Sequence, residues 1–152
     1  MNSTILPKAS AAARFLGVLV LGALAGCAAR GTHPDFLPYL GAFETAAAHH
    51  GRRVDTGRVV VTYGVTQPET AVASCFRLPF APPQVHVNRR LWREIEPPCR
   101  EIYLFHELGH CALHRLHARG DRLSLMRWNT VSCADYLKRR ETYLRELFRA
   151  TP

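Results

Sequence analysis

The segment His106-Glu107-Leu108-Gly109-His110 constrains the fold of this chain more than any other. Pro97-Pro98 upstream is a helix-start signal, and the residues around the segment are densely apolar, so we expect a largely buried helix. The apolar positions are Ile102, Leu104, Phe105, Leu108, Ala112 and Leu113. On such a helix His106 and His110 differ by about 40° around the axis and about 6 Å along it, so both rings can bind one ion. Because unpaired polar side chains are costly in a core, this pattern predicts half of a catalytic zinc site.

A catalytic zinc takes three protein ligands and keeps an open position for water, so one more donor must follow His110. Four residues could supply it: His114, His117, Asp135 and Glu141. In a continuous helix His114 lies about 12 Å along the axis from His106, which is too far for all three rings to meet. His117 can swing back if the chain leaves helical geometry soon after Ala112, and either acid requires that the last helix crosses the first. We expect His117 and leave the other three open.

The residues from Phe105 to Met126, FHELGHCALHRLHARGDRLSLM, resemble the zincin metallopeptidases, particularly the metzincin type, and small bacterial lipoproteins with a similar HELGHC segment. In metzincins a third His follows through a glycine turn, and a methionine turn lies beneath the metal. Ser124-Leu125-Met126 resembles that turn and makes Met126 its methionine. Leu113 stands where the glycine is usual, and the third His comes one residue late, which a longer turn would accommodate.

The resemblance implies a small α+β, zincin-like domain with a short mixed sheet, an active-site helix and a C-terminal helix. It also implies that Zn²⁺ is held by His106, His110 and His117, and that a peptide or protein substrate is hydrolysed. Glu107 would act as general base on the water, and Tyr136 could assist at the oxyanion. The strand near residues 84–88 could offer its edge to an extended peptide.

Two other interpretations remain open. The first is a catalytically silent zincin-like binding or scaffold lipoprotein, favoured by the missing glycine turn and the small size; an intact Glu107 argues against it. The second is a basic, disulfide-stapled envelope-binding module in which the motif arose by chance. Gly109 is either required for a close approach of its helix or merely tolerated there.

The amino terminus reads as an export signal. Lys8 and Arg14 precede an apolar run from Phe15 to Ala25 that is too short for a comfortable membrane span. The run closes on Leu24-Ala25-Gly26-Cys27, which resembles the bacterial lipobox. We therefore expect a lipoprotein signal peptide at residues 1–26, lipidation and membrane attachment at Cys27, a tether at 27–34 and the metallopeptidase domain at 35–152. An incidental cysteine or an uncleaved anchor is the alternative.

By resemblance to Gram-negative lipoproteins, Ala28 after the cysteine favours the outer membrane, facing the periplasm. Loss of residues 1–26 removes two positive charges and no negative one, so the net charge falls from +8 to +6. The charge is mostly scattered arginine, which is typical of a solvated surface; attraction to anionic lipid or cell-envelope polymers is the functional alternative. We see no basic motif interleaved with aromatic residues, and nucleic acid is not an expected partner. The sequence does not indicate an oligomeric state.

Four cysteines remain after Cys27: Cys75, Cys99, Cys111 and Cys133. An even number in an oxidising compartment favours disulfides, and four cysteines allow three pairings, which the sequence leaves open. A thiolate zinc site is the rival, but no C-x-x-C pair occurs. A bridge from Cys99 or Cys111 would brace the motif helix.

Periodicity and turn signals place the remaining elements. We expect helices at residues 35–50 and 132–148 and a brief helical turn at 89–96 after Asn88. Strands are expected at 58–65 and 84–88. Residues 67–83 read as a long connection or an irregular hairpin, and 118–129 as irregular.

Overall fold

The computed structural model describes residues 31–120 and 123–149. The expected signal peptide, Cys27 and the first part of the tether lie outside the described residues, and so does the very end of the chain. Among the residues described, no helix combines the length and the apolar character needed to cross a membrane.

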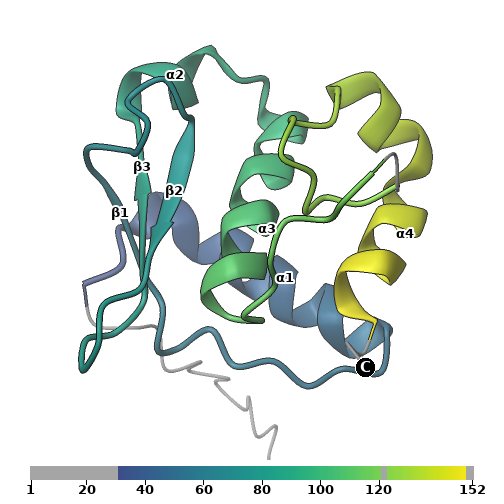
Figure 1. The fold of residues 1–152 in the computed structure, drawn as a ribbon, viewed down its shortest axis with the longest axis horizontal. Coiled ribbons are helices and arrows are strands. Elements are labelled where there is room, and N and C mark those ends of the chain that lie inside the picture. Colours follow the sequence, from purple (N-terminus) through teal and green to yellow (C-terminus); the bar gives the residue numbers. More distant parts are fainter. Residues whose placement is uncertain (1–30, 121–122, 150–152) are drawn as a thin grey trace, which may run out of the picture.

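The described chain forms a small α+β domain with four helices and a three-stranded mixed sheet (Figure 1). The helices are α1 (Leu37–His49), α2 (Arg89–Glu94), α3 (Arg100–Cys111) and α4 (Cys133–Phe148), and 3-10 turns at Pro34–Phe36 and Pro97–Cys99 precede α1 and α3. The strands are β1 (Val60–Tyr63), β2 (Ala73–Phe76) and β3 (Gln84–Val87). β3 lies in the middle, parallel to β1 and antiparallel to β2, which confirms the predicted mixed sheet.

Local signals explain where the helices begin and end. The Asn88 side chain accepts N–H groups of Arg90 and Leu91 at the start of α2, and Ser132 caps α4 by accepting the N–H of Asp135. α1 stops at His49, and Gly51 follows with φ of +72°, a left-handed conformation that glycine adopts without strain. These are the helix boundaries that the sequence predicted to within two to three residues.

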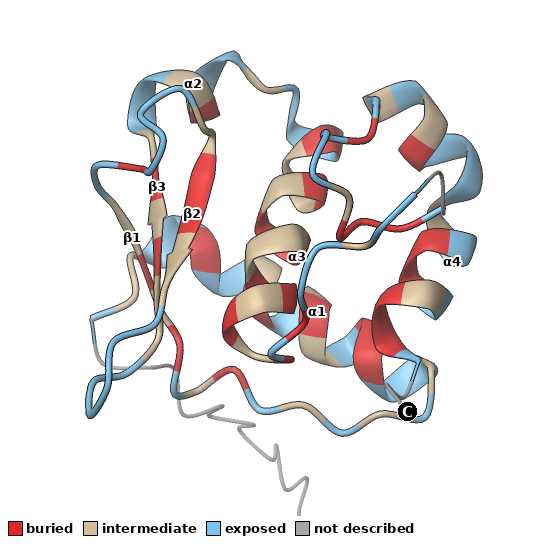
Figure 2. Ribbon diagram, in the orientation of Figure 1, coloured by how far each residue is buried: buried red, intermediate tan, exposed pale blue. Residues whose placement is uncertain are grey.

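Helix α3 is the centre of the molecule, with the sheet on one side, α4 on the other and α1 crossing behind (Figure 1). Phe43 of α1 packs edge-on against Phe105 of α3 and Phe148 of α4, with both pairs of ring centroids 5.0 Å apart. The inward sides of these helices are buried (Figure 2). The apolar pattern of the motif segment therefore marks a true core helix.

Two disulfides join α3 to its neighbours. Cys75–Cys111 connects β2 to the last residue of α3, and Cys99–Cys133 connects the turn before α3 to the first residue of α4. The helix is thus tied covalently at both ends, as a bridge from Cys99 or Cys111 was expected to do.

One expectation about the sheet was incomplete and one was wrong. Of the two interpretations of segment 67–83, the hairpin is the nearer one, because the segment contains a regular strand, β2, that pairs antiparallel with β3. Since β3 pairs on both sides, it has no free edge to offer a peptide; the strand at the edge of the sheet beside α3 is β2.

Candidate metal centre

Three histidine side chains converge beside the C-terminal half of α3. The Nε2 atoms of His106 and His110 are 3.1 Å apart, and each lies 3.2 Å from Nε2 of His117. Tetrahedral coordination with Zn–N bonds of ~2.0–2.1 Å separates two ligand nitrogens by about 3.3–3.4 Å. The spacing of the three nitrogens is therefore close to that of three ligands of one zinc ion.

A turn after α3 brings His117 back to the helix. The helix ends at Cys111, His114 takes a left-handed conformation with φ of +57°, and the N–H of Arg115 donates to the carbonyl of Gly109 at 2.9 Å. The N–H of Ala118 then donates to the carbonyl of Met126 at 2.7 Å. His114 thus takes the left-handed conformation that reverses the chain, one residue after the position where metzincins usually have glycine.

Backbone carbonyls orient the two helical histidines. Nδ1 of His106 lies 2.6 Å from the carbonyl oxygen of Leu125, and Nδ1 of His110 lies 2.7 Å from that of Arg115. Because a carbonyl can only accept, each Nδ1 carries the proton and each neutral ring presents a lone pair at Nε2. Such second contacts fix the tautomer and direction of zinc-binding histidines.

The lone pairs of His106 and His110 face each other at 3.1 Å and repel unless a proton donor or a cation lies between them. Protonating a ring is disfavoured, because burial lowers the pKa of His106 to about 4 and also lowers the pKa values of His110 and His117. Neutral imidazoles with converging acceptors are the donor set that Zn²⁺ prefers. The residues present therefore fit a bound zinc ion.

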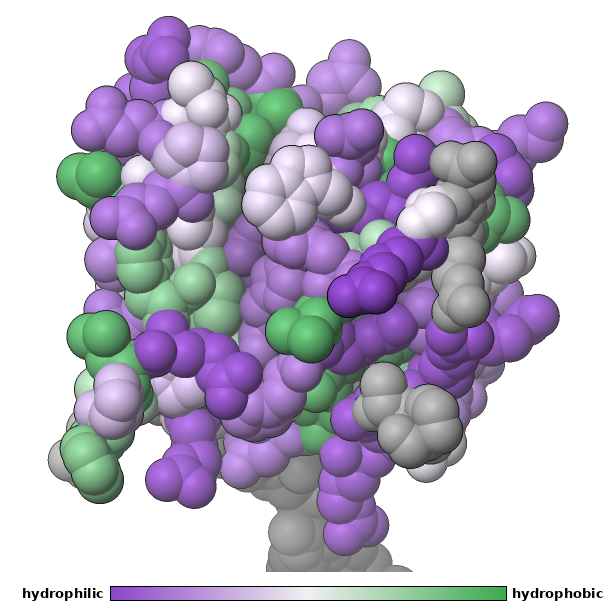
Figure 3. Space-filling view, viewed as in Figure 1, coloured by the Kyte–Doolittle hydropathy of each residue, from purple (hydrophilic) through white to green (hydrophobic). Residues whose placement is uncertain are grey.

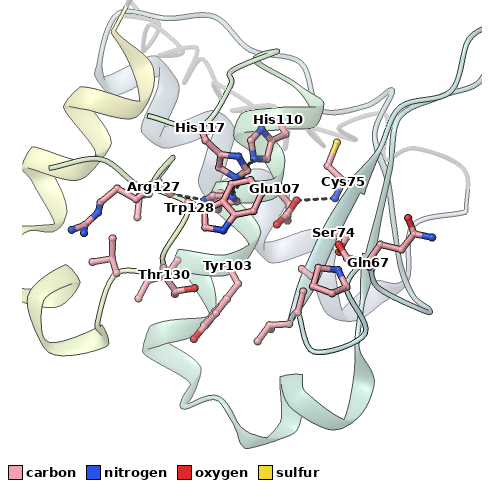
Figure 4. A pocket seen from close by; sticks show the side chains of 18 of the residues that line it. Gln67, Ser74, Cys75, Tyr103, Glu107, His110, His117, Arg127, Trp128 and Thr130 are labelled. Carbon is pink, nitrogen blue, oxygen red and sulfur yellow. Dashed lines mark hydrogen bonds between the residues drawn. The ribbon is translucent and has the colours of Figure 1, made fainter. Parts of the chain in front are cut away.

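Glu107 lies between the histidines and the edge of the sheet (Figure 4). Its Oε2 accepts the N–H of Cys75 at 2.7 Å. Burial raises the pKa of Glu107 to about 7, and the hydrogen bond from Cys75 opposes this rise. With one carboxylate oxygen held by β2, the other remains to contact a molecule in the cleft.

The other three candidate ligands lie elsewhere. The exposed His114 is in the turn and outside the histidine triangle. Asp135 accepts from Arg139 and from the hydroxyl of Tyr143 on its own helix, and Glu141 faces His50 with Oε1 3.5 Å from Nε2. Among the described residues, only His117 joins His106 and His110 in one group.

Gly109 is required for a close approach. A Cβ built at this position would overlap Sδ of Met126 and come within 3.3 Å of Cδ1 of Leu147. Met126 is fully buried and packs against α3 at Gly109, the residue before His110. The methionine of the Ser124-Leu125-Met126 segment therefore supports the helix that carries two of the histidines.

A buried ion pair joins the turn after α3 to α4. Nη2 of Arg115 lies 2.6 Å from Oε1 of Glu146 on α4, and Nη1 donates to the carbonyls of Glu146 and Leu147 at 2.6 and 2.9 Å. Oε2 of Glu146 accepts the Ser124 hydroxyl at 2.5 Å, and Oγ of Ser124 accepts the N–H of Met126. Arg115, expected on the solvated surface, is instead only 9% exposed.

This ion pair holds both segments that orient the helical histidines. Arg115 supplies the carbonyl bonded to His110, and Ser124 immediately precedes Leu125, which supplies the carbonyl bonded to His106. One carboxylate, that of Glu146, thus connects the two segments that support the candidate metal centre.

A cavity of about 680 Å³ opens beside the three rings. Its floor is α3, one wall is β2 with residues 67–72, and the other wall is the segment 125–131. Trp128 is 80% exposed at the rim and packs edge-on against His117, with ring centroids 4.7 Å apart. Tyr103 and Thr130 line the end away from the histidines (Figure 4).

The sequence suggested the wrong tyrosine for the site and did not indicate several of the cavity residues. Tyr136, proposed to assist at the oxyanion, is fully buried and donates its hydroxyl to Glu101, so that expectation was wrong. Tyr103 is the tyrosine that lines the cavity, one turn before the motif, where helical spacing from His106 could have indicated it. The contacts of Cys75 and Trp128 depend on tertiary packing and left no local signal.

Comparison with known proteins does not add to this geometry: no family model, no curated protein and no solved structure matches the chain.

Proposed function

We propose that this protein is a zinc-dependent metallopeptidase with a zincin-like site. The observation that carries the proposal is the triangle of Nε2 atoms at 3.1 to 3.2 Å, with Glu107 beside it and an open cavity in front. The left-handed turn to His117 and the methionine packed under Gly109 support the resemblance to metzincins.

His106, His110 and His117 would hold the zinc. When bound, the ion would polarise a peptide carbonyl and lower the pKa of a water molecule toward ~7. Glu107 would accept the proton of that water through its free carboxylate oxygen and pass it to the leaving amine. The N–H of Cys75 keeps the carboxylate aimed at the cleft while this happens.

The outer edge of β2 suits an extended peptide as substrate. Val72 accepts the N–H of Asn88 on the β3 side, whereas the N–H of Cys75 points the other way, toward Glu107. Hydrogen-bonding directions alternate along a strand, so the main-chain groups of Ala73 and the carbonyl of Cys75 face the cleft, whereas the N–H of Cys75 is held by Glu107. A substrate lying there would bind by strand addition, which suits a peptide better than a compact small molecule.

We also propose that the protein is exported and held on the outer membrane, facing the periplasm, by lipid at Cys27. Two disulfides in a small domain suit an oxidising compartment. The supporting test is radiolabelled palmitate incorporation, which should occur in the wild-type chain and be lost in Cys27→Ala.

The test of function is metal content and peptidase activity of the purified protein. Zinc near one ion per chain should be lost in His106→Ala and His117→Ala and kept in Glu107→Gln, which should lack turnover. His114→Asn is the matched control, since asparagine tolerates the left-handed conformation and the side chain lies outside the triangle. Folded wild type that takes up no zinc would refute the proposal, and zinc without turnover would favour the binding lipoprotein.

A further inference from the structure

The connection between β2 and β3 exposes apolar side chains. Residues 77–82, which we name the tip, are all exposed and read Arg-Leu-Pro-Phe-Ala-Pro. Phe80 is fully exposed, and Leu78 is 65% exposed. Phe80 also has φ of +63°, a conformation that is rare and strained for a bulky residue. An exposed aromatic side chain on a strained backbone is a candidate contact for an apolar partner surface.

The tip lies at the end of the sheet where the described chain begins. The N–H of Val60, the first residue of β1, donates to the carbonyl of Pro83, which directly follows the tip. A Cβ built at Gly31 would lie 3.6 Å from Cγ1 of the same valine. In Figure 3 hydrophobic side chains protrude at the lower left, beyond this end of the strands.

This position places the tip close to the proposed lipid anchor. Cys27 precedes Gly31 by four residues, which can span at most about 14 Å when fully extended. If Cys27 carries acyl chains, the bilayer lies within that reach of the sheet end. In a lipidated chain the membrane is therefore an apolar surface close to the tip.

The charges near the tip suit an anionic surface. Arg77 lies in the tip, and the exposed Arg58 lies two residues before β1 at the same end of the sheet. The tip contains no acidic residue. Apolar or aromatic side chains flanked by arginine are typical of segments that rest in the interfacial layer of an anionic bilayer.

We propose that the tip is a membrane-contact surface that inserts Leu78 and Phe80 into the interface of an anionic lipid bilayer. The proposal rests on the lipid anchor at Cys27 and is independent of peptidase activity. Two attachments, the acyl chains and the tip, would fix the orientation of the domain, whereas a single flexible tether would leave it free to turn.

The test is tryptophan fluorescence of the full lipidated protein in vesicles of phosphatidylethanolamine and phosphatidylglycerol. Trp128→Phe removes the exposed native tryptophan, and Trp92 is buried and gives a constant background. Phe80→Trp is the probe. Leu137→Trp is the matched control, because Leu137 is a 52% exposed leucine on α4, in another part of the domain.

Emission of Phe80→Trp should shift to shorter wavelength and lose most of its intensity when the lipids carry bromine in their acyl chains. Leu137→Trp should show neither change, and quenching of Phe80→Trp should weaken when phosphatidylglycerol is replaced by phosphatidylcholine. Equal quenching of the two variants in vesicle-bound protein would refute membrane contact by the tip. A shift of the Phe80→Trp emission that appears only when another protein is added would also refute it, because the partner would then be a protein. Sedimentation with the vesicles tests the anchor separately, and protein that stays in solution would overturn both proposals.

Discussion

Replacement of Glu146, on α4, tests how the fold supports the candidate metal centre. The carboxylate is 13% exposed and accepts hydrogen bonds from Arg115 and Ser124. Removing one partner of a buried ion pair costs about 3–5 kcal/mol, since the other charge stays buried. We expect Glu146→Ala to lose free energy of unfolding of this order. Glu146→Gln keeps the shape and one acceptor, and should lose about 1–3 kcal/mol.

The same change should weaken zinc binding. Without the carboxylate, the carbonyls of Arg115 and Leu125 are held less firmly against Nδ1 of the two helical histidines. Loss of such outer contacts typically costs about 10–100-fold in metal affinity. We expect the Kd for zinc to rise by this factor in Glu146→Gln while the three ligands remain intact.

The assay pairs denaturant unfolding of the metal-free protein with zinc titration against a chromophoric chelator. Glu141→Gln is the matched control: it makes the same chemical change on the same helix at a side chain that is 54% exposed, and should shift stability by less than about 0.5 kcal/mol. A folded Glu146→Gln protein with wild-type zinc affinity would refute the supporting role of the ion pair. Glu146→Asp, which keeps the charge, should restore part of the affinity.

Three further predictions concern the helix, the donor set and the disulfides. Gly109→Ala should destabilise the protein by about 1–3 kcal/mol in urea unfolding despite the helix propensity of alanine, because the new methyl overlaps Met126. Three histidines of ordinary pKa would lose roughly a thousandfold in zinc affinity between pH 7.5 and 5.5, because protons compete with the metal. Here the affinity should fall far less, since burial lowers the pKa values of all three histidines and moves this competition to lower pH. Replacing Cys75 and Cys111 together by serine opens a loop of sequence separation 36 and should cost about 4 kcal/mol, on the order of 15 °C in Tm by calorimetry.

Each of these predictions has an opposing outcome. Combining Gly109→Ala with Met126→Ala should cost less than the sum of the two single changes, and strict additivity would show that the residues do not compete for space. A full thousandfold loss of zinc affinity in the titration would show that the histidines titrate as exposed groups. An unchanged Tm in the double serine variant would mean that packing alone holds β2 to α3.

Local periodicity predicted most of the fold because the helices carry their own signals. Asn88, Ser132 and Gly51 mark helix ends through capping and backbone chemistry, and these signals act over a few residues. The motif spacing likewise placed His106 and His110 on one face of a buried helix. Strand β2 escaped prediction because it is only four residues long and is defined by pairing with β3 and by the bond from Cys75 to Cys111.

Residues that meet through tertiary packing could not be chosen from the sequence alone. The position of His117 depends on the left-handed conformation of His114, which few non-glycine residues adopt, so four candidates for the third ligand remained. Arg115 and Glu146 are 31 residues apart, and each looks like an ordinary surface charge until the last helix packs against the turn. Tyr136 illustrates the reverse case, in which residue type suggested a role in the site for a side chain buried elsewhere.

The two disulfides have a mechanical consequence for the cleft. The Cys75–Cys111 bond joins the C-terminal end of α3, the floor of the cleft, to β2, which is one wall. The Cys99–Cys133 bond joins the turn before α3 to the start of α4, just beyond the segment that forms the other wall. Walls tied to a common floor helix in this way have little freedom to move apart. For the proposed peptidase, such a cleft would favour an extended chain as substrate over a bulky folded protein.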